Sequence, residues 1–304
     1  MVVALVVLAA ALHATWNAIV KSIDDRLSLM AMMGLATTAV CLSVAAIAPS
    51  PPAGALPFLF GSIAVHGVYN LLLVALYGDA DFNQAYPLAR GISPPSVALF
   101  AVLVVGETLS PLQITGVAIL SVGLLGVALP ARRRGGRRGG DTGSASSRRT
   151  VWLALVTGVS IATYTVLDGL GVRRCGTPFG YGGWLFVGEG LIVPAVWAWY
   201  RLDAAARGVR GLGPDGGARG LRLLRLPRSL LARAATAAVI SVLAYGLVLW
   251  AQTRGELAIV AGLRETSVVF GAVIGATVFR ERLPSQRIVA SILIAAGAIA
   301  LAVT

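Results

Sequence analysis

The feature that most constrains the fold is a series of apolar runs, each long enough to cross a lipid bilayer. A transmembrane helix needs roughly 20 apolar residues. Ten such runs lie at about 2–21, 28–48, 57–77, 83–105, 112–129, 151–169, 179–200, 231–251, 256–279 and 284–303. Only 12% of the 304 residues are charged and 57% are hydrophobic, whereas a soluble domain carries about 25% charged residues. The chain is therefore predicted to be an all-α polytopic membrane protein with ten transmembrane helices.

The two halves of the chain repeat each other in sequence. Arg264 follows Arg90 by 174 positions, and Glu281 follows Glu107 by the same 174 positions. In each half an apolar run joins the arginine to the glutamate. Internal repetition of this kind is typical of secondary transporters built from two related halves.

A segment rich in Arg, Gly and Ser, residues 131–150, separates the repeats. Its composition predicts a flexible linker between a first five-helix unit, residues 1–130, and a second, residues 151–304. Because each unit has an odd number of spans, the two units enter the bilayer in opposite senses. The sequence thus predicts two inverted five-helix repeats.

The net charge of +12 comes from 25 basic and 13 acidic residues, and most of the excess lies in residues 132–149 and 201–228. Basic loops between spans encode topology and contact anionic lipid. Neither segment has interleaved aromatic residues for base stacking, so a nucleic-acid partner is not predicted. Both segments follow odd-numbered spans, and the positive-inside rule places them in the cytoplasm with both chain termini outside.

Polar side chains form matching stripes on two of the expected helices. His13, Trp16 and Asn17 stand at i, i+3 and i+4 in the first span, and His66 and Tyr69 keep the same spacing in the third. Such residues share one face of a helix. We interpret both stripes as a substrate-binding wall containing groups that titrate near neutral pH. The alternative is hydrogen bonding between helices that holds the bundle together.

Arg90 and Arg264 are the strongest candidates for binding a substrate. A central arginine in a membrane span carries a penalty of about 2.5–3.5 kcal/mol, so it is a functional candidate by default. A guanidinium binds a carboxylate or phosphate through two parallel hydrogen bonds. Tyr86 lies one turn before Arg90 and belongs to the same predicted site. The alternative is a permanent ion pair with an acidic residue of the membrane region.

Three acidic residues within the spans are candidates for proton coupling or for pairing with the arginines: Asp168, Glu189 and Glu265. A carboxylate in a low-dielectric setting can carry a proton at neutral pH. Glu189 lies deepest and has no basic neighbour in sequence. Tyr164, one turn before Asp168, and Tyr245 are expected to shape the same site.

Other residues are interpreted as structural. Glu107 and Glu281 stand where apolar runs end, and we expect them to mark the membrane interface and to pair with loop arginines or cap a helix. Gly116, Gly123 and Gly297 lie in the fifth and tenth spans, where small residues allow close helix packing.

Several stretches resemble the EamA-type family of the drug/metabolite transporter superfamily. They are residues 12–18 with Lys21, residues 86–91, the Gly-Glu-Thr-Leu of 106–109 and the Arg-Glu-Arg-Leu of 280–283. The resemblance implies ten spans, a central cavity between the halves and a secondary transporter, often an exporter, in the plasma (inner) membrane. Members transport amino acids, nucleotide sugars, phosphorylated sugars, drugs and other small metabolites. They are usually drawn with cytoplasmic termini, opposite to the arginine bias of this chain.

The leading hypothesis is a secondary active transporter of a small metabolite that carries an anionic group, and the family resemblance implies that it is an exporter. Two alternatives remain, a membrane-embedded enzyme acting on lipid or prenyl substrates and an uncoupled channel. The sequence contains no Asp-rich metal motif and no His-Glu-x-x-His, and no cofactor is expected. The expected partners are the small-molecule substrate and the lipid bilayer, and a monomer is sufficient for a complete site.

Overall fold

The computed structural model describes residues 1–23, 25–79, 82–128, 143–206, 227–281 and 283–303, and the elements in them are all helical. In chain order they are α1 (Val2–Lys21), α2 (Arg26–Ile47), α3 (Leu56–Asp79), α4 (Phe82–Phe100), the π-helical η1 (Ala101–Val105), α5 (Pro111–Ala128), α6 (Gly143–Cys175), α7 (Pro178–Ala206), α8 (Arg228–Gln252), α9 (Leu257–Arg264), α10 (Ser267–Thr277) and α11 (Ser285–Ala302).

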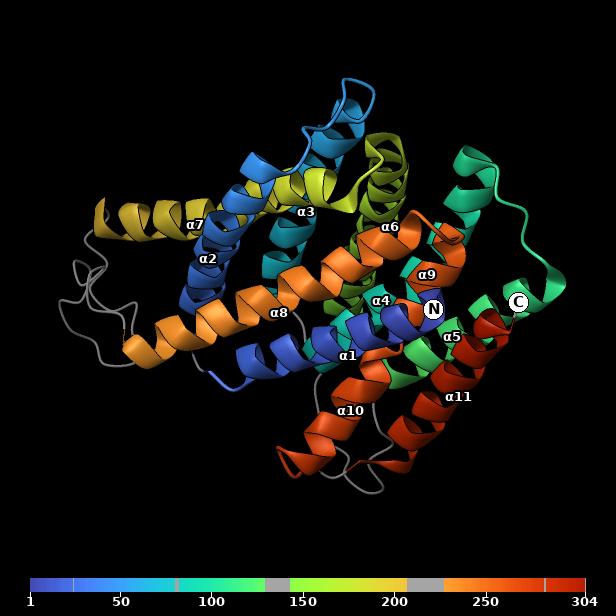
Figure 1. The fold of residues 1–304 in the computed structure, drawn as a ribbon. Coiled ribbons are helices and arrows are strands. Elements are labelled where there is room, and N and C mark those ends of the chain that lie inside the picture. Colours follow the sequence, from blue (N-terminus) through green and yellow to red (C-terminus); the bar gives the residue numbers. More distant parts are fainter. Residues whose placement is uncertain (24, 80–81, 129–142, 207–226, 282, 304) are drawn as a thin grey trace.

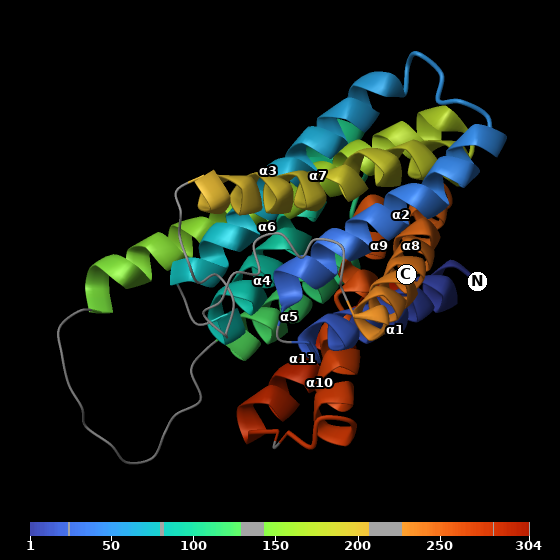
Figure 2. The same ribbon diagram turned by 90° about the vertical axis from the view of Figure 1, so that its left-hand side faces the viewer.

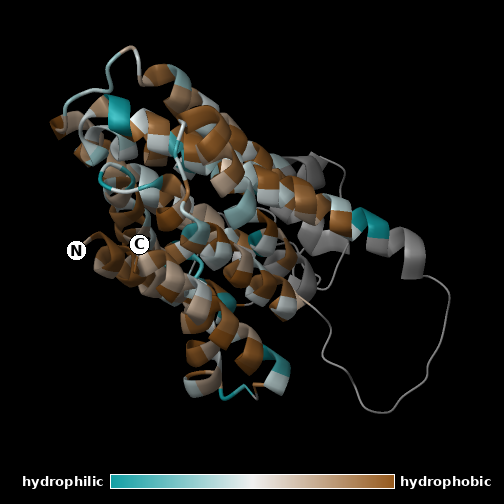
Figure 3. Ribbon diagram, turned by 90° about the vertical axis from the view of Figure 1, so that its right-hand side faces the viewer, coloured by the Kyte–Doolittle hydropathy of each residue, from teal (hydrophilic) through white to brown (hydrophobic). Residues whose placement is uncertain are grey.

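Most of these helices are long and apolar enough to cross a membrane. Nine segments of the described chain meet that criterion, with α9 and α10 counted as one segment, Leu257–Thr277. The described apolar part of α3, Leu56–Leu72, is shorter. Hydrophobic residues make up most of the length of these helices (Figure 3). The protein is therefore a polytopic membrane protein.

Two helix boundaries differ from the expected ones. α6 begins at Gly143, whereas the sequence predicted a linker up to residue 150. Residues 144–150 contain neither Pro nor a further Gly, so nothing in that stretch stops a helix from extending beyond the apolar run. The expected span 256–279 is interrupted, because α9 ends at Arg264 and α10 begins at Ser267.

Helices from the first half of the chain pack mainly on helices from the second half. α1 lies against α8, α3 against α6, α2 against α7, and α5 against α11. Figure 1 shows α5 and α11 side by side, and Figure 2 shows the same packing from another direction. The chain ends, marked N and C, lie on the same side of the molecule (Figure 1).

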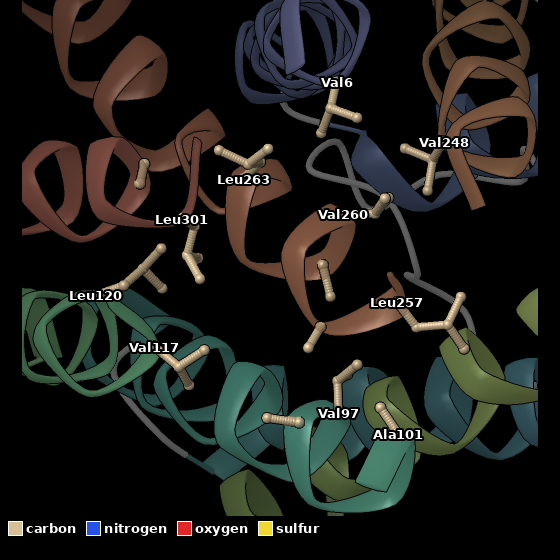
Figure 4. Packing of buried hydrophobic residues seen from close by; sticks show 14 of the residues in the cluster. Val6, Val97, Ala101, Val117, Leu120, Val248, Leu257, Val260, Leu263 and Leu301 are labelled. Atoms are coloured by element: carbon tan, nitrogen blue, oxygen red, sulfur yellow. The ribbon is translucent and has the colours of Figure 1, made fainter. Parts of the chain in front are cut away.

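The largest apolar core surrounds α9. Leu257, Val260 and Leu263 project from α9 toward apolar side chains of the neighbouring helices, which include Val97 and Leu120 (Figure 4). Every residue of α9 except Ile259 is buried, whereas α10 buries only two of its residues. One half of this span is thus anchored in the core, and the other half is held more loosely.

The contact between α5 and α11 depends on glycine at the crossing. A Cβ on Gly297 would lie 2.7 Å from the Gly116 carbonyl oxygen and 2.7 Å from the Leu120 backbone nitrogen. A Cβ on Gly123 would lie 2.9 Å from the backbone nitrogen of Ile294. Small residues here let two helix backbones approach closely, as is common in membrane bundles.

Replacing Gly297 with alanine is expected to destabilise the protein by about 1–3 kcal/mol, because the backbone of α5 must move away from the added methyl group. Gly271 in α10 is the matched control, since no atom lies within 4 Å of the Cβ it lacks. Gly271→Ala should leave stability unchanged or raise it by up to about 1 kcal/mol. Thermal unfolding of both variants in one detergent checks this, and equal midpoints would contradict the close contact.

Candidate functional site

The break between α9 and α10 lies inside the bundle and sets the geometry of the site. The N–H groups of Glu265 and Thr266 bond the carbonyls of Gly262 and Leu263, three residues earlier, at 3.0 and 3.1 Å. These tighter bonds end α9 before α10 begins at Ser267. Arg264, Glu265 and Ser267 therefore stand together at the junction, and all three are buried.

Arg90 of α4 joins the two sides of this break. Its Nε lies 2.8 Å from Oε2 of Glu265, and both side chains are almost completely buried. The same guanidinium donates to Oγ of Ser267 at 2.9 Å. Of the two readings of Arg90, the geometry shows the ion pair, which connects α4 to the junction.

Arg264 has a different environment. Its guanidinium donates to the Tyr164 hydroxyl at 3.4 Å and lies 5.6 Å from the centre of the Tyr245 ring. Within the described chain, no carboxylate forms an ion pair with Arg264, and its buried Nε has no hydrogen-bond partner. A buried cation with an open donor is the arrangement that an anionic ligand completes.

His13 of α1 offers a second open donor near both arginines. Arg90 and Arg264 both act electrostatically on its imidazole. Trp16 donates its indole N–H to His13 Nδ1 at 3.3 Å, so in the neutral ring Nε2 carries the hydrogen. That Nε2 is buried and has no partner among the described residues. The Asn17 side-chain amide donates a hydrogen bond to the His13 carbonyl of the same helix at 2.8 Å.

Asp168 is connected to Arg264 through Tyr245, which contacts both residues. The Tyr245 hydroxyl donates to its Oδ2, and the Tyr181 hydroxyl donates to its Oδ1 at 3.1 Å. Gly171 makes room for this arrangement, because a Cβ there would overlap the Tyr181 ring. In the described structure Asp168 therefore bonds tyrosine hydroxyls and forms no ion pair with an arginine.

Glu189 of α7 faces His66 of α3. Its Oε2 lies 3.9 Å from His66 Nε2, while His66 Nδ1 donates to the Ser62 carbonyl at 3.0 Å. The glycines on either side of Glu189 bring α7 close to its neighbours. A Cβ on Gly188 would lie 2.5 Å from the Ile63 side chain of α3.

Aromatic rings connect these groups. His66 stacks on Tyr164 with ring centres 3.9 Å apart, and Tyr69 meets the same ring edge-on at 5.7 Å. His66 also lies edge-on to Tyr245, 6.3 Å away. The stripe on α3 thus packs on Tyr164 and Tyr245, the two tyrosines that contact Arg264.

The structure brings most of the predicted site residues into one neighbourhood, whereas the side chain of Tyr86 lies outside the described ones. Sequence reasoning did not assign Ser267 or Tyr181 to the site. Ser267 had a usable signal, since it falls one turn after Arg264. Tyr181 had none, because it bonds Asp168 from a different helix. Among the described residues, no cluster of three or more His, Cys, Asp or Glu could hold a metal ion.

Comparisons with known proteins agree with this architecture. The pattern of the EamA-like transporter family matches residues 148–303, about half of the chain. The chain belongs to this family, whose members are generally transporters. One solved structure, titled only as a crystal structure of a protein, aligns with a TM-score of 0.67 over 99% of this chain and 96% of that chain. Its sequence identity is 15%, so it shows the shared fold alone. No curated protein sequence matches the chain.

Proposed function

We propose that the protein is a secondary active transporter that moves a small metabolite with an anionic group by alternating access. It acts as a multi-pass carrier in the plasma (inner) membrane, in the direction of export. In this proposal ten spans form two inverted repeats around one central site.

The pairing of helices supports the repeat. Counting α9 and α10 as one span, the counterpart of each helix lies five spans further along the chain. Exchanging each helix for its counterpart converts the α1–α8 contact into the α6–α3 contact, which is also observed. The same exchange leaves the α2–α7 and α5–α11 contacts unchanged, because each joins a helix to its own counterpart. A two-fold axis between the halves accounts for this pattern.

The observation that carries the anion assignment is the set of unsatisfied donors at the centre. Arg264 Nε and His13 Nε2 are buried N–H groups without an acceptor in the described chain. A buried donor without a partner costs about 1–3 kcal/mol, and more when the group is charged. The oxygens of a carboxylate or phosphate are the acceptors that such donors lack, and the negative charge would neutralise the guanidinium.

Proton coupling is assigned to the pair of His66 and Glu189. Because His66 Nδ1 donates to a backbone carbonyl, its second nitrogen faces the carboxylate across 3.9 Å. At 3.9 Å the two groups are not hydrogen-bonded, so a closer approach or a bridging water is required for a proton to pass between them. His66 stacks on Tyr164, which accepts a hydrogen bond from Arg264. Gain or loss of the proton would then alter the environment of the bound anion.

A ligand screen by thermal unfolding tests the substrate class. A ligand that binds only the folded protein stabilises it by about 2.7 kcal/mol at 100 times its Kd. The panel pairs each anion with a neutral analogue of similar shape, such as benzoate with benzamide and glucose 6-phosphate with glucose. The proposal expects a rise in unfolding temperature with carboxylates or phosphates and none with their neutral partners. Stabilisation by neutral or cationic compounds alone would refute the anion assignment.

A further inference from the structure

Two glutamates end equivalent helices with the same backbone geometry. The N–H of Glu107 and that of Glu281 each bond the carbonyl six residues earlier, both at 3.0 Å. Each follows a residue with positive φ, Gly106 at 79° and Arg280 at 54°. Each carboxylate then pairs with a basic residue at the end of a helix from the other half of the chain. We name the two contacts the Arg173 latch and the Lys21 latch.

The Arg173 latch closes the end of the bundle where the chain begins. Glu107 accepts from Arg173 at 3.2 Å and from the N–H of Leu257, the first residue of α9, at 2.9 and 3.0 Å. Arg173 also donates to the carbonyls of Gln252 and Gly255, each at 2.8 Å. The Glu107 side chain is only 9% exposed. This latch is a network that fastens α6, α8 and α9 together.

The Lys21 latch closes the opposite end. Lys21 Nζ lies 2.6 Å from Oε1 of Glu281, and the two side chains are 51% and 36% exposed. Lys21 also lies 5.3 Å from the Phe279 ring centre. In the described part of the chain, no other side chain bonds the Glu281 carboxylate. This latch holds the end of α10, the loosely packed half of its span.

Three differences make the second latch the weaker one. A lone exposed ion pair contributes little, since solvent screens it and both side chains lose freedom, whereas breaking a buried network leaves charges and backbone groups unpaired. Arg280 holds a left-handed conformation that disfavours residues with a Cβ, while Gly106 adopts the equivalent conformation without strain. Finally, α10 has the helix break behind it and few buried residues to resist movement.

We propose that the Lys21 latch is the release point of this carrier: from the closed state the bundle opens at the Lys21 end, by movement of α10, while the Arg173 latch stays closed. This inference rests on the alternating access of the proposed function and adds which end opens. The chain segments rich in arginine connect helix ends on the Lys21 side. Under the positive-inside rule that side is cytoplasmic, opposite to the orientation in which the family is usually drawn, and the proposed opening at the Lys21 end applies to either orientation.

Hydrogen–deuterium exchange of the purified protein in lipid nanodiscs, without ligand, tests the proposal. Lys21→Met should speed exchange in residues 267–277 of α10 roughly two- to five-fold, the range expected from losing one exposed pair. Exchange in residues 257–264 of α9 should not change. The charge-swapped double variant, Lys21→Glu with Glu281→Lys, should return α10 to the wild-type rate, whereas Lys21→Glu alone should not.

Arg254→Met is the matched control, because Arg254 is exposed near the Arg173 end and its guanidinium stacks on Trp250, with no ion pair to any carboxylate of the described residues. It should leave α10 unchanged. Unaltered α10 exchange in Lys21→Met, or equal acceleration of α9 and α10, would overturn the proposal. The readout needs no substrate, so a failed ligand screen leaves it intact, and a failed latch leaves the anion site intact.

Discussion

Replacing Arg264 with glutamine is expected to abolish transport while the protein still folds. Arg264 is the buried guanidinium that no described carboxylate pairs, so its removal takes away the charge that would bind the substrate anion. Truncating one partner of a buried charge pair costs about 2–5 kcal/mol, which corresponds to a loss of about 30-fold or more in binding. Uptake into proteoliposomes at a fixed substrate concentration measures the loss.

Stability and a second arginine serve as controls for this variant. Arg264→Gln should keep or raise its unfolding temperature without ligand, because an uncompensated buried charge disappears. Arg254→Gln, on the exposed surface, should transport like the unmodified protein. Transport by Arg264→Gln at the unmodified rate would remove Arg264 from the substrate site.

The second large effect concerns Arg90 and Glu265, and it should appear as lost stability. Their ion pair is buried at 2.8 Å, and breaking such a pair by removing one partner costs about 3–5 kcal/mol. Arg90→Met and Glu265→Gln should each lower the unfolding temperature by on the order of 10 °C. The double variant, which leaves no unpaired charge, should be more stable than the sum of the two losses predicts.

Thermal unfolding of the four proteins in one detergent gives the coupling between the two residues. Additive losses would mean that the pair is not formed in the membrane-embedded protein. The result also separates the roles of the two arginines. Replacing Arg90 should mainly lower stability, because the junction between α9 and α10 loses its ion pair. Replacing Arg264 should mainly weaken ligand binding.

The repeated register shows how far the sequence alone leads. The common spacing of 174 positions between Arg90 and Arg264 and between Glu107 and Glu281 predicts equivalent positions in two repeats, and Glu107 and Glu281 do share one backbone geometry. Apolar runs located the helices because hydropathy in lipid leaves few alternatives. The break after Arg264 was not predictable, since residues 262–267 contain no proline and only tertiary contacts fix the turn.

For the site, the sequence indicated which residues to consider but not which of them pair. Residue type and depth in the membrane made the arginines and the histidines candidates for the site, but they left the choice of partner open. Glu265, Glu189 and Asp168 were equivalent candidates to pair with an arginine, and only helix packing distinguishes them. Glu265 meets Arg90, Glu189 meets His66, and Asp168 bonds tyrosine hydroxyls.

Glu107 illustrates a prediction whose type was correct but whose partner could not be foreseen. It was expected to cap a helix or to pair with a loop arginine, and it caps α9 and pairs with Arg173, which lies in the last turn of α6. The helix it caps begins at Leu257, 150 positions further along the chain. The spacing of residues along the sequence cannot reveal such a contact, because the contact forms only when the two halves of the chain pack together.

Counterflow in proteoliposomes tests the central claim most directly. Vesicles loaded with an excess of an unlabelled anion from the ligand screen are diluted into a trace of the same labelled anion. A carrier that alternates between two faces exchanges the two, so the label should rise transiently above its equilibrium level, and Arg264→Gln should show no such rise. Simple equilibration without an overshoot would indicate a channel, and the absence of any protein-dependent flux across the anions tested would contradict the account.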